Sequence, residues 1–424
     1  MSKGNDTAQL ILGRNVMGGH FECLSQDQRR RHLYSIGSTG AGKTTFLQSL
    51  ILQDIHLGRG VCVIDPHGDM AEEIANCIPR HRVNDVIYFD AGDREHPIGF
   101  NPLSGWDSDD QRELVASQIV STFKGLWRDS WGEWLEYLLK NTLLALLERR
   151  GVAISLLSIP RMLEDPEYRA HILAGVHDPV VKGFWQDYFG GFGNREQHER
   201  ISSTLNKAGK FVLSPVLRNI LGQKRSGFDM TAVMDEGKVL IVNLAKGKIG
   251  EDNANFLGSL IVSDIVGRAM QRADRPEASR RDFHLFIDEF QSLTTDSFAT
   301  IVSEARKYRL SLAISHQNFD QISPKVLAAI LKNTGTLAAF RVNFEDAQKL
   351  ALSFRPVLAG ALAESQTGEF WCQMNGKVRQ IQSIAPWEQE KLCRGSVGRV
   401  QRSSRMRFGC NREILRRDFK LWWR

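Results

Sequence analysis

The chain has 424 residues, of which 42% are hydrophobic and 25% charged, a balance typical of a globular protein with two or three domains. Its six cysteines show no C-x-x-C spacing and no segment reaches the roughly 18 apolar residues of a membrane helix, so we expect no disulfide framework, no cysteine zinc site and no integral membrane segment. The net charge of +6 comes from residues 391–424, which hold 11 Lys/Arg and 2 Asp/Glu, so the overall charge is weak support for DNA binding by the rest of the chain.

The first strong signal lies at residues 33–45, LYSIGSTGAGKTT, where a short apolar strand runs into a glycine-rich loop. The loop fits the pattern G-x-x-x-x-G-K-[ST], and a helical pattern follows it. Such a loop presents backbone N–H groups to a triphosphate, with its lysine at the β- and γ-phosphates and its hydroxyl on Mg²⁺. The alternative is a glycine-rich turn without a ligand. We predict that ATP is bound by Gly37, Ser38, Thr39, Gly40, Ala41, Gly42, Lys43, Thr44 and Thr45.

Strands then alternate with helices. VCVID (61–65) and DVIYFDAG (85–92) are apolar runs typical of buried parallel strands, and a helix over 70–79 separates them. The first hundred residues therefore predict a parallel α/β sheet. Asp65 and Asp69 follow the strand at 61–65, and we expect them near the nucleotide or at a subunit contact, with a structural role as the alternative.

The character of the sequence changes after HPIGFNPLSG (96–105). From about 108 to 222 nearly every segment has helical periodicity, which predicts an all-helical domain inserted into the α/β domain. The α/β pattern resumes with strands expected at 238–244, 282–290, 311–317 and 335–342, and with a hairpin over 370–382. We therefore predict an α/β fold class: a P-loop NTPase core with a mainly parallel central sheet, plus an inserted all-α domain.

This pattern predicts four parts of the chain. They are an N-terminal part of the ATPase domain (1–105), the inserted helical domain (106–230), a C-terminal part of the ATPase domain (231–390) and a basic tail (391–424). The tail is rich in arginine and contains Trp422 and Trp423. It is either a nucleic-acid-binding segment or a disordered or non-native end, and its composition favours the second interpretation.

Two carboxylates end the strand in DFHLFIDEF (282–290). Ligands of parallel sheets lie at the carboxyl ends of the strands, so Asp288 can hold Mg²⁺ there. Glu289 is expected to point differently, because successive side chains of a strand alternate, and it can orient or deprotonate the attacking water. An acidic strand end without a catalytic role is the alternative.

Three further residues complete the predicted catalytic set. Gln317 ends the strand SLAISHQ and can sense the γ-phosphate, or simply cap the strand. His316, beside it, is expected to face the other side and to pack or form a hydrogen bond there. Arg306, on the helix before that strand, can supply a cation to the γ-phosphate of a neighbouring subunit, and Arg309 is the less favoured candidate. A solvated helix face is the alternative for both arginines.

The ordered set GSTGAGKTT, VIDPHGD, a helical insertion, LFIDEF, SEARKYRL and ISHQ resembles the type IV coupling proteins of bacterial conjugation (TraD/TraG-like), within the HerA/FtsK group of P-loop ATPases. The resemblance covers roughly residues 10–385. It implies a RecA-like core and ATP with Mg²⁺, held by Lys43, Thr44 and Asp288. It also implies catalysis by Glu289, Lys43, Gln317 and Arg306.

The resemblance further implies partners: a homo-hexamer, DNA bound without sequence preference, the relaxosome or relaxase, and the type IV secretion channel. Many such proteins carry N-terminal membrane helices that this sequence does not show, so we expect a cytoplasmic protein, with peripheral contact at the inner membrane as an option. Two alternatives stay open. One is a HerA/FtsK-like helicase or pump in DNA processing or phage defence, and the other is an ATP-binding adaptor that recruits a nucleoprotein substrate.

Overall fold

The computed structural model describes residues 9–106, 108–293, 298–388 and 395–423. Contacts divide the chain into two compact units. The described residues of 1–90, 230–247 and 268–407 form what we call the α/β unit, and those of 91–229, 248–267 and 408–424 form the helical unit. Within the described residues, no helix has the length and apolar character needed to cross a membrane.

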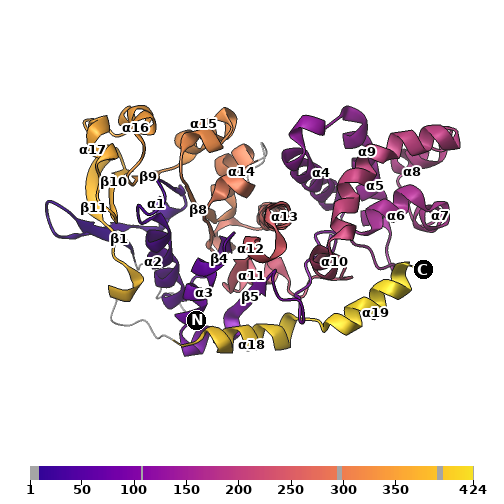
Figure 1. Cartoon of the computed structure of the whole chain (residues 1–424), viewed down its shortest axis with the longest axis horizontal. Coiled ribbons are helices and arrows are strands. Elements are labelled where there is room, and N and C mark those ends of the chain that lie inside the picture. The colour runs from indigo at the N-terminus through magenta and orange to yellow at the C-terminus, as the bar shows by residue number, and fades with distance from the viewer. Residues whose placement is uncertain (1–8, 107, 294–297, 389–394, 424) are drawn as a thin grey trace. The chain divides into compact units, whose positions relative to one another are not determined.

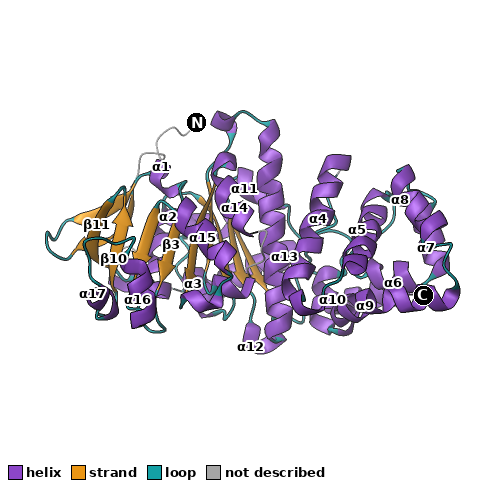
Figure 2. Ribbon diagram, turned by 90° about the horizontal axis from the view of Figure 1, so that it is seen from above, coloured by secondary structure: helices purple, strands orange, loops and turns teal. Residues whose placement is uncertain are grey.

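The α/β unit is built on one sheet of eleven described strands (Figure 1; Figure 2). Their order across the sheet is β2-β1-β11-β10-β9-β3-β8-β7-β4-β6-β5. The seven strands from β9 to β5 are parallel, while β10, β11, β1 and β2 are antiparallel. Their bounds are β1 (Leu10–Asn15), β2 (Phe21–Leu24), β3 (Leu33–Ile36), β4 (Gly60–Asp65), β5 (Val86–Asp90), β6 (Val239–Asn243), β7 (Phe283–Ile287), β8 (Leu310–His316), β9 (Thr336–Ala339), β10 (Glu369–Met374) and β11 (Lys377–Gln382).

Every residue of β3, β4, β6, β7 and β8 is buried, as expected for parallel strands covered on both faces. The hairpin β10–β11 turns at Asn375 and Gly376, which both have positive φ and thus match the twist of the two strands. The expected α/β fold with a mainly parallel sheet is confirmed. The helices of this unit are α1 (Gln26–Arg29), α2 (Lys43–His56), α3 (Asp69–Asn76), α11 (Met230–Asp235), α14 (Phe298–Glu304), α15 (Pro324–Asn333), α16 (Phe344–Ala351), α17 (Ala359–Ala363) and α18 (Val397–Phe408).

The helical unit has a core of aromatic side chains. Phe211 and Phe256 stack with ring centroids 3.6 Å apart, and Phe123 meets both edge-on. The first long helix starts where Ser108 and Gln111 form a capping box. Its helices are α4 (Asp109–Leu126), α5 (Glu133–Glu148), α6 (Ser158–Glu164), α7 (Pro166–Leu173), α8 (Pro179–Gly183), α9 (Asn194–Leu213), α10 (Pro215–Leu221), α19 (Arg412–Trp423) and most of α13 (Glu251–Met270), with α12 (Lys246–Ile249) at the boundary between the units.

The unit boundaries differ from the expected domain boundaries in two places. Residues 91–105 and 248–267 group with the helical unit, whereas their sequence suggested the α/β domain. The reason for 248–267 is the packing of Phe256 into the aromatic core, which helical periodicity alone does not reveal.

The tail is helical, so the expectation of a disordered end is wrong for residues 397–423. In α18, Val400 is fully buried in the core of the α/β unit, and Ser404 is buried as well. The Ser404 hydroxyl accepts from the backbone N–H of Tyr88 (2.9 Å) and donates to the Val86 carbonyl (3.4 Å). Both belong to β5, the last strand of the sheet, so α18 covers an edge that would otherwise expose unpaired backbone groups (Figure 1).

A core substitution tests this packing. Phe46 of α2 is fully buried, with its ring 4.8 Å from that of Phe370 and 5.6 Å from that of Phe340. We expect Phe46→Ala to destabilise the α/β unit by about 3–5 kcal/mol, because it removes buried contacts and leaves a cavity. Amide hydrogen exchange of β9 and β10 measures the change, and Phe344→Ala, at a ring that is 58% exposed, should leave it unaltered. Equal protection in the wild type and the Phe46 variant would contradict this packing.

Candidate functional site

Three adjacent parallel strands bring the predicted residues to one edge of the sheet. β3, β8 and β7 are neighbours, so their carboxyl ends lie at the same edge. The glycine-rich loop follows β3, Gln317 follows β8, and Asp288 with Glu289 follows β7. Residues far apart in the sequence thus converge at one edge of the sheet.

The loop between β3 and α2 has a shape that only glycine permits at two points. Gly42 has φ +104°, and a Cβ there would lie 3.0 Å from the backbone of Gly368. At Gly37 a Cβ would lie 2.6 Å from Cβ of Phe340. The loop is therefore packed closely against the segments that follow β9 and precede β10.

The loop has backbone N–H groups without hydrogen-bond acceptors and a buried lysine beside them. Helix α2 begins without a side-chain cap, and within the described residues the backbone N–H groups of Gly40, Gly42, Lys43 and Thr44 have no acceptor. The buried Lys43 ammonium donates to the carbonyls of Gly37 (2.5 Å) and Ser38 (3.1 Å). Burial lowers the pKa of Lys43, although the carboxylates of the two residues after β7 oppose this. N–H groups, a helix N-terminus and a buried cation together favour an anion such as a polyphosphate.

Asp288 and Thr44 face each other beside this loop. The Thr44 hydroxyl donates to a carboxylate oxygen of Asp288 at 2.8 Å. Burial raises the pKa of Asp288, the Thr44 hydrogen bond opposes this, and the Glu289 charge adds to it. Within the described residues, no group of three or more His, Cys, Asp or Glu could hold a metal. These oxygens therefore fit Mg²⁺ only when phosphate oxygens and water complete its shell.

Glu289 adopts a left-handed backbone conformation (φ +50°), which is uncommon for a residue other than glycine. β7 ends at Ile287, so this turn, and not the alternation of a strand, sets the direction of its side chain. One carboxylate oxygen accepts from Gln317 Nε2 (2.8 Å) and the other from Gln291 Nε2 (2.5 Å). The carboxylate is thus held in place by two amides.

The two candidate arginines have different surroundings. Arg309 forms ion pairs with Glu277 (3.2 Å) and Asp282 (3.7 Å), which gives it a structural role. Arg306 is exposed and has no side-chain partner among the described residues. It lies in a short 3-10 helix, Ala305–Tyr308, which ends just before β8 begins.

Arg306 therefore lies at the opposite edge of the sheet from Gln317. β8 has seven residues, which at roughly 3.3 Å each separate the two ends by about 20 Å. His32, which precedes β3, marks the same edge: burial lowers its pKa to about 4, a hydrogen bond to the Val302 carbonyl opposes this, and the Arg306 charge adds to it. Arg306 cannot complete the site of its own chain.

Among the described residues, the side chains of Asp65, Asp69 and His316 form no hydrogen bond to the glycine-rich loop, although Asp65 ends β4 at the same edge of the sheet and its charge adds to burial in raising the pKa of Asp288. The buried Asp65 carboxylate accepts from the backbone N–H groups of His67 and Ala71, both at 2.9 Å, which holds the turn before α3. Asp69 is exposed at the first position of α3. His316 is buried between Tyr34 and Phe290, as expected, and burial lowers its pKa to about 3.

Sequence reasoning missed the outer wall of the loop. The N–H of Gly368 donates to the Ala41 carbonyl (3.0 Å), and the N–H of Ser38 donates to the Arg341 carbonyl (2.8 Å). The sequence also gives no signal for Gln291, whose amide donates to the Glu289 carboxylate. A Thr-Gly pair before a hairpin was visible, but nothing in the sequence distinguishes it from other turns.

Comparison with family models matches residues 1–350 to the family described as type IV secretory system conjugative DNA transfer. The chain belongs to this family. The resemblance to coupling proteins drawn from the motifs is thereby confirmed for most of the chain. A search of the curated proteins finds no significant match.

This member of the conjugative DNA transfer family has the same fold as several proteins of known structure. The bacterial conjugative coupling protein TrwB in its trigonal form with sulphate superposes with a TM-score of 0.67 at 16% identity, covering 94% of this chain and 92% of that one. TrwB with ADP and Mg²⁺ gives 0.64 at 16% identity, with coverage of 93% and 94%. VirB4 of Thermoanaerobacter pseudethanolicus gives 0.65 at 18% identity, with coverage of 91% and 99%. At sequence identities of 16–18%, these comparisons show that the fold is shared.

The raised pKa of Asp288 yields a prediction with two parts. A buried carboxylate whose pKa is raised destabilises the fold when ionised, so Asp288→Asn should raise the thermal midpoint of the nucleotide-free protein by a few degrees at pH 7. The gain should vanish below about pH 3.9, where Asp288 is protonated in both states. Magnesium-dependent hydrolysis should be lost. Thermal scans across pH measure the first part, and Asp320→Asn, at a side chain 77% exposed, is the control. A lower midpoint for the Asp288 variant at pH 7 would contradict the assignment.

Proposed function

We propose that this member of the conjugative DNA transfer family is an ATP-hydrolysing DNA translocase that acts as a coupling protein in type IV secretion. One observation carries the proposal: Lys43, Thr44, Asp288, Glu289 and Gln317 gather at the carboxyl edge of three adjacent strands. Binding alone would not need the last two, because among the described residues neither forms a hydrogen bond to the loop that would hold the phosphates. Their presence favours hydrolysis over an adaptor that only binds ATP.

Each residue has a distinct role in the proposed reaction. The loop and Lys43 bind and orient the β- and γ-phosphates. Thr44 and Asp288 would hold Mg²⁺, which supplies charge neutralisation at the phosphate oxygens. Glu289, fixed by its two amide partners, takes a proton from the attacking water. Gln317, bonded to Glu289, is placed to respond to the γ-phosphate without adding charge.

The missing cation would come from a neighbouring subunit. Arg306 is exposed at the far edge of its own sheet, so it can approach a phosphate only in another copy of the chain. A ring in which each subunit presents Arg306 to the next satisfies this at every site, and we propose a homo-hexamer. Hydrolysis at the seams would then drive relative motion of subunits and pull DNA held by its phosphates.

Similar solved structures support ATP and Mg²⁺ as the ligands. TrwB has been solved with ADPNP, with GDPNP, and with ADP and Mg²⁺. We propose that this chain also binds ATP and Mg²⁺, because its fold is similar and because its glycine-rich loop, the Thr44 hydroxyl and the Asp288 carboxylate lie together in that fold. The family description supports DNA and the type IV secretion system as partners. We further propose contact with a relaxase complex and a position in the cytoplasm near the inner membrane.

The first test is ATP turnover by the full chain with and without single- or double-stranded DNA. We expect DNA to stimulate hydrolysis, and Lys43→Ala to abolish both basal and stimulated turnover because the γ-phosphate loses its buried cation. Lys325→Ala, at an exposed lysine of α15, should behave like the wild type. Equal rates in the presence and absence of DNA would contradict the proposal.

A mixing experiment tests the shared site. Arg306→Ala and Lys43→Ala subunits should each be inactive alone, since one lacks the donated cation and the other lacks the loop lysine. Mixed together, they should recover part of the ATPase activity, because some seams then combine an intact loop with an intact arginine. Recovery in the mixture is measured against each variant alone at the same total concentration. Full activity of Arg306→Ala by itself would rule out the shared site.

A further inference from the structure

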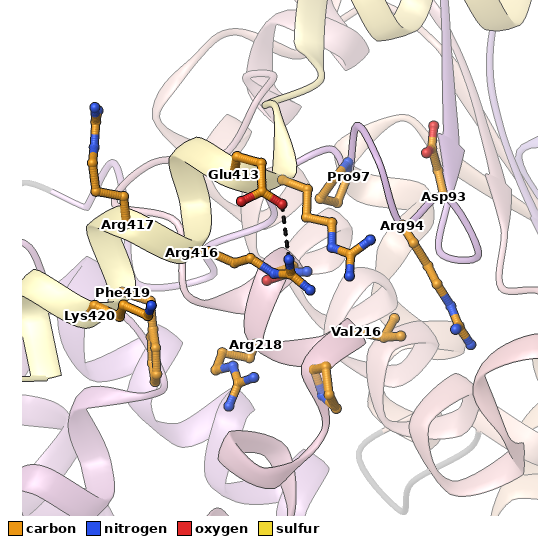
Figure 3. A pocket seen from close by; sticks show the side chains of 13 residues that line it. Asp93, Arg94, Pro97, Val216, Arg218, Glu413, Arg416, Arg417, Phe419 and Lys420 are labelled. Carbon is orange, nitrogen blue, oxygen red and sulfur yellow. Dashed lines mark hydrogen bonds and ion pairs between the residues drawn. The ribbon is translucent and has the colours of Figure 1, made fainter.

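The helical unit contains a cleft of about 950 Å³ that the proposed ATP site does not use (Figure 3). One wall is α19, and the other is α10 with the segment 93–97. Two carboxylates, Asp93 and Glu413, line it together with a larger set of cations: Arg94, Arg218, Arg412, Arg416, Arg417 and Lys420. The lining is therefore strongly basic.

Helix α19 is fixed to the helical unit by one side. The Arg218 guanidinium lies 4.8 Å from the ring centroid of Phe419, and that of Arg161 lies 5.5 Å from the ring of Trp422. Arg161 also donates to the Trp422 carbonyl. At the start of the helix, the N–H of Arg412 donates to the Glu95 carbonyl at 3.0 Å. These contacts hold both ends of α19 against the helical unit, so its cleft-lining residues have a fixed backbone.

One face of α19 carries a regular row of cations. Arg412, Arg416 and Lys420 are spaced four residues apart and therefore share one face of the helix. The rise between neighbours is about 6 Å. A row of charges with constant spacing matches a ligand whose own charges repeat regularly. Figure 3 shows α19 on one side of the cleft and Arg94 on the other, with Arg416 reaching between them.

The cations are available to a ligand. Among the described residues, Arg94, Arg218 and Lys420 have no carboxylate partner. Arg412 pairs with Glu95 and Arg416 with Glu413, but these glutamates are 67% and 74% exposed. Exposed pairs of this kind contribute little and are readily exchanged for a stronger anion.

We propose that this basic cleft binds the phosphate backbone of a nucleic acid strand, as a contact separate from the ATP site. The proposal rests on the proposed function, because DNA is the polyanion that such a protein handles. Arginines dominate the cleft, and their forked donors suit phosphate oxygens better than lysine does. An acidic peptide is the other polyanion to consider, but its charges lack the constant spacing of a backbone. The family match ends at residue 350, so α19 lies outside it and nothing in that match assigns this site.

The test uses the full chain with Arg416→Gln and Lys420→Gln combined, both at exposed positions. The probe is a fluorescein-labelled single-stranded oligodeoxynucleotide, with its duplex as a second arm, followed by anisotropy over a series of salt concentrations. We expect affinity to fall roughly tenfold and the salt slope to shrink by roughly 1.5 to 2, because two phosphate contacts are lost. The matched control removes the same charges from α9 of the same unit, by Arg195→Gln and Lys210→Gln, and should bind like the wild type.

The outcomes separate this inference from the proposed function. Weaker DNA binding by the cleft variant, with unchanged basal ATP turnover in the absence of DNA, supports the cleft as a DNA contact. Wild-type binding by the cleft variant at every salt concentration, while DNA still stimulates the ATPase, would overturn the cleft and leave the motor standing. An equal loss in the α9 control would overturn it too, since only total charge would then matter. Labelled polyglutamate that binds the wild type and loses affinity in the cleft variant, where DNA does not, would assign the cleft to an acidic protein segment instead.

Discussion

The structure depends on a parallel sheet that buries a lysine and an aspartate at its carboxyl edge. Lys43 is 6% exposed and Asp288 is 7% exposed, and burial acts against the charged form of both. Within the described part of the chain, the ammonium has only carbonyl partners and the first N–H groups of α2 have none. Buried charged and polar groups are stabilised when a ligand provides their missing partners. A phosphate chain would provide the anion for Lys43 and for the N–H groups, and Mg²⁺ would provide the cation for Asp288.

The same sheet keeps Arg306 away from the phosphate site of its own chain. In a parallel sheet, residues that precede a strand and residues that follow it lie at opposite edges, so Arg306 and Gln317 are kept apart by the length of β8. The cation and the site it would serve can meet only between copies. In the proposed motor, catalysis would therefore depend on assembly, and this dependence would couple chemistry to the relative motion of subunits.

Much of this was predictable because the signals are local. The loop pattern, the apolar strands and the carboxylates after β7 each occupy a few consecutive residues, and the rule that ligands meet at carboxyl ends joins them. What the sequence could not give depends on contacts between distant segments. The close approach of Gly368 to Gly42, the aromatic core that draws 248–267 into the helical unit, and the burial of Ser404 against β5 leave no periodic pattern. The tail is an example: its composition predicts disorder, whereas α18 buries two of its side chains, Val400 and Ser404.

The most direct test of the central claim is an experimental structure of the assembled protein with Mg²⁺ and a non-hydrolysable ATP analogue. We expect the phosphates in the loop 37–42, the metal between Thr44 and Asp288, and Arg306 of the adjacent subunit within hydrogen-bonding distance of the γ-phosphate. A nucleotide bound elsewhere, or an assembly in which every Arg306 faces solvent, would contradict it.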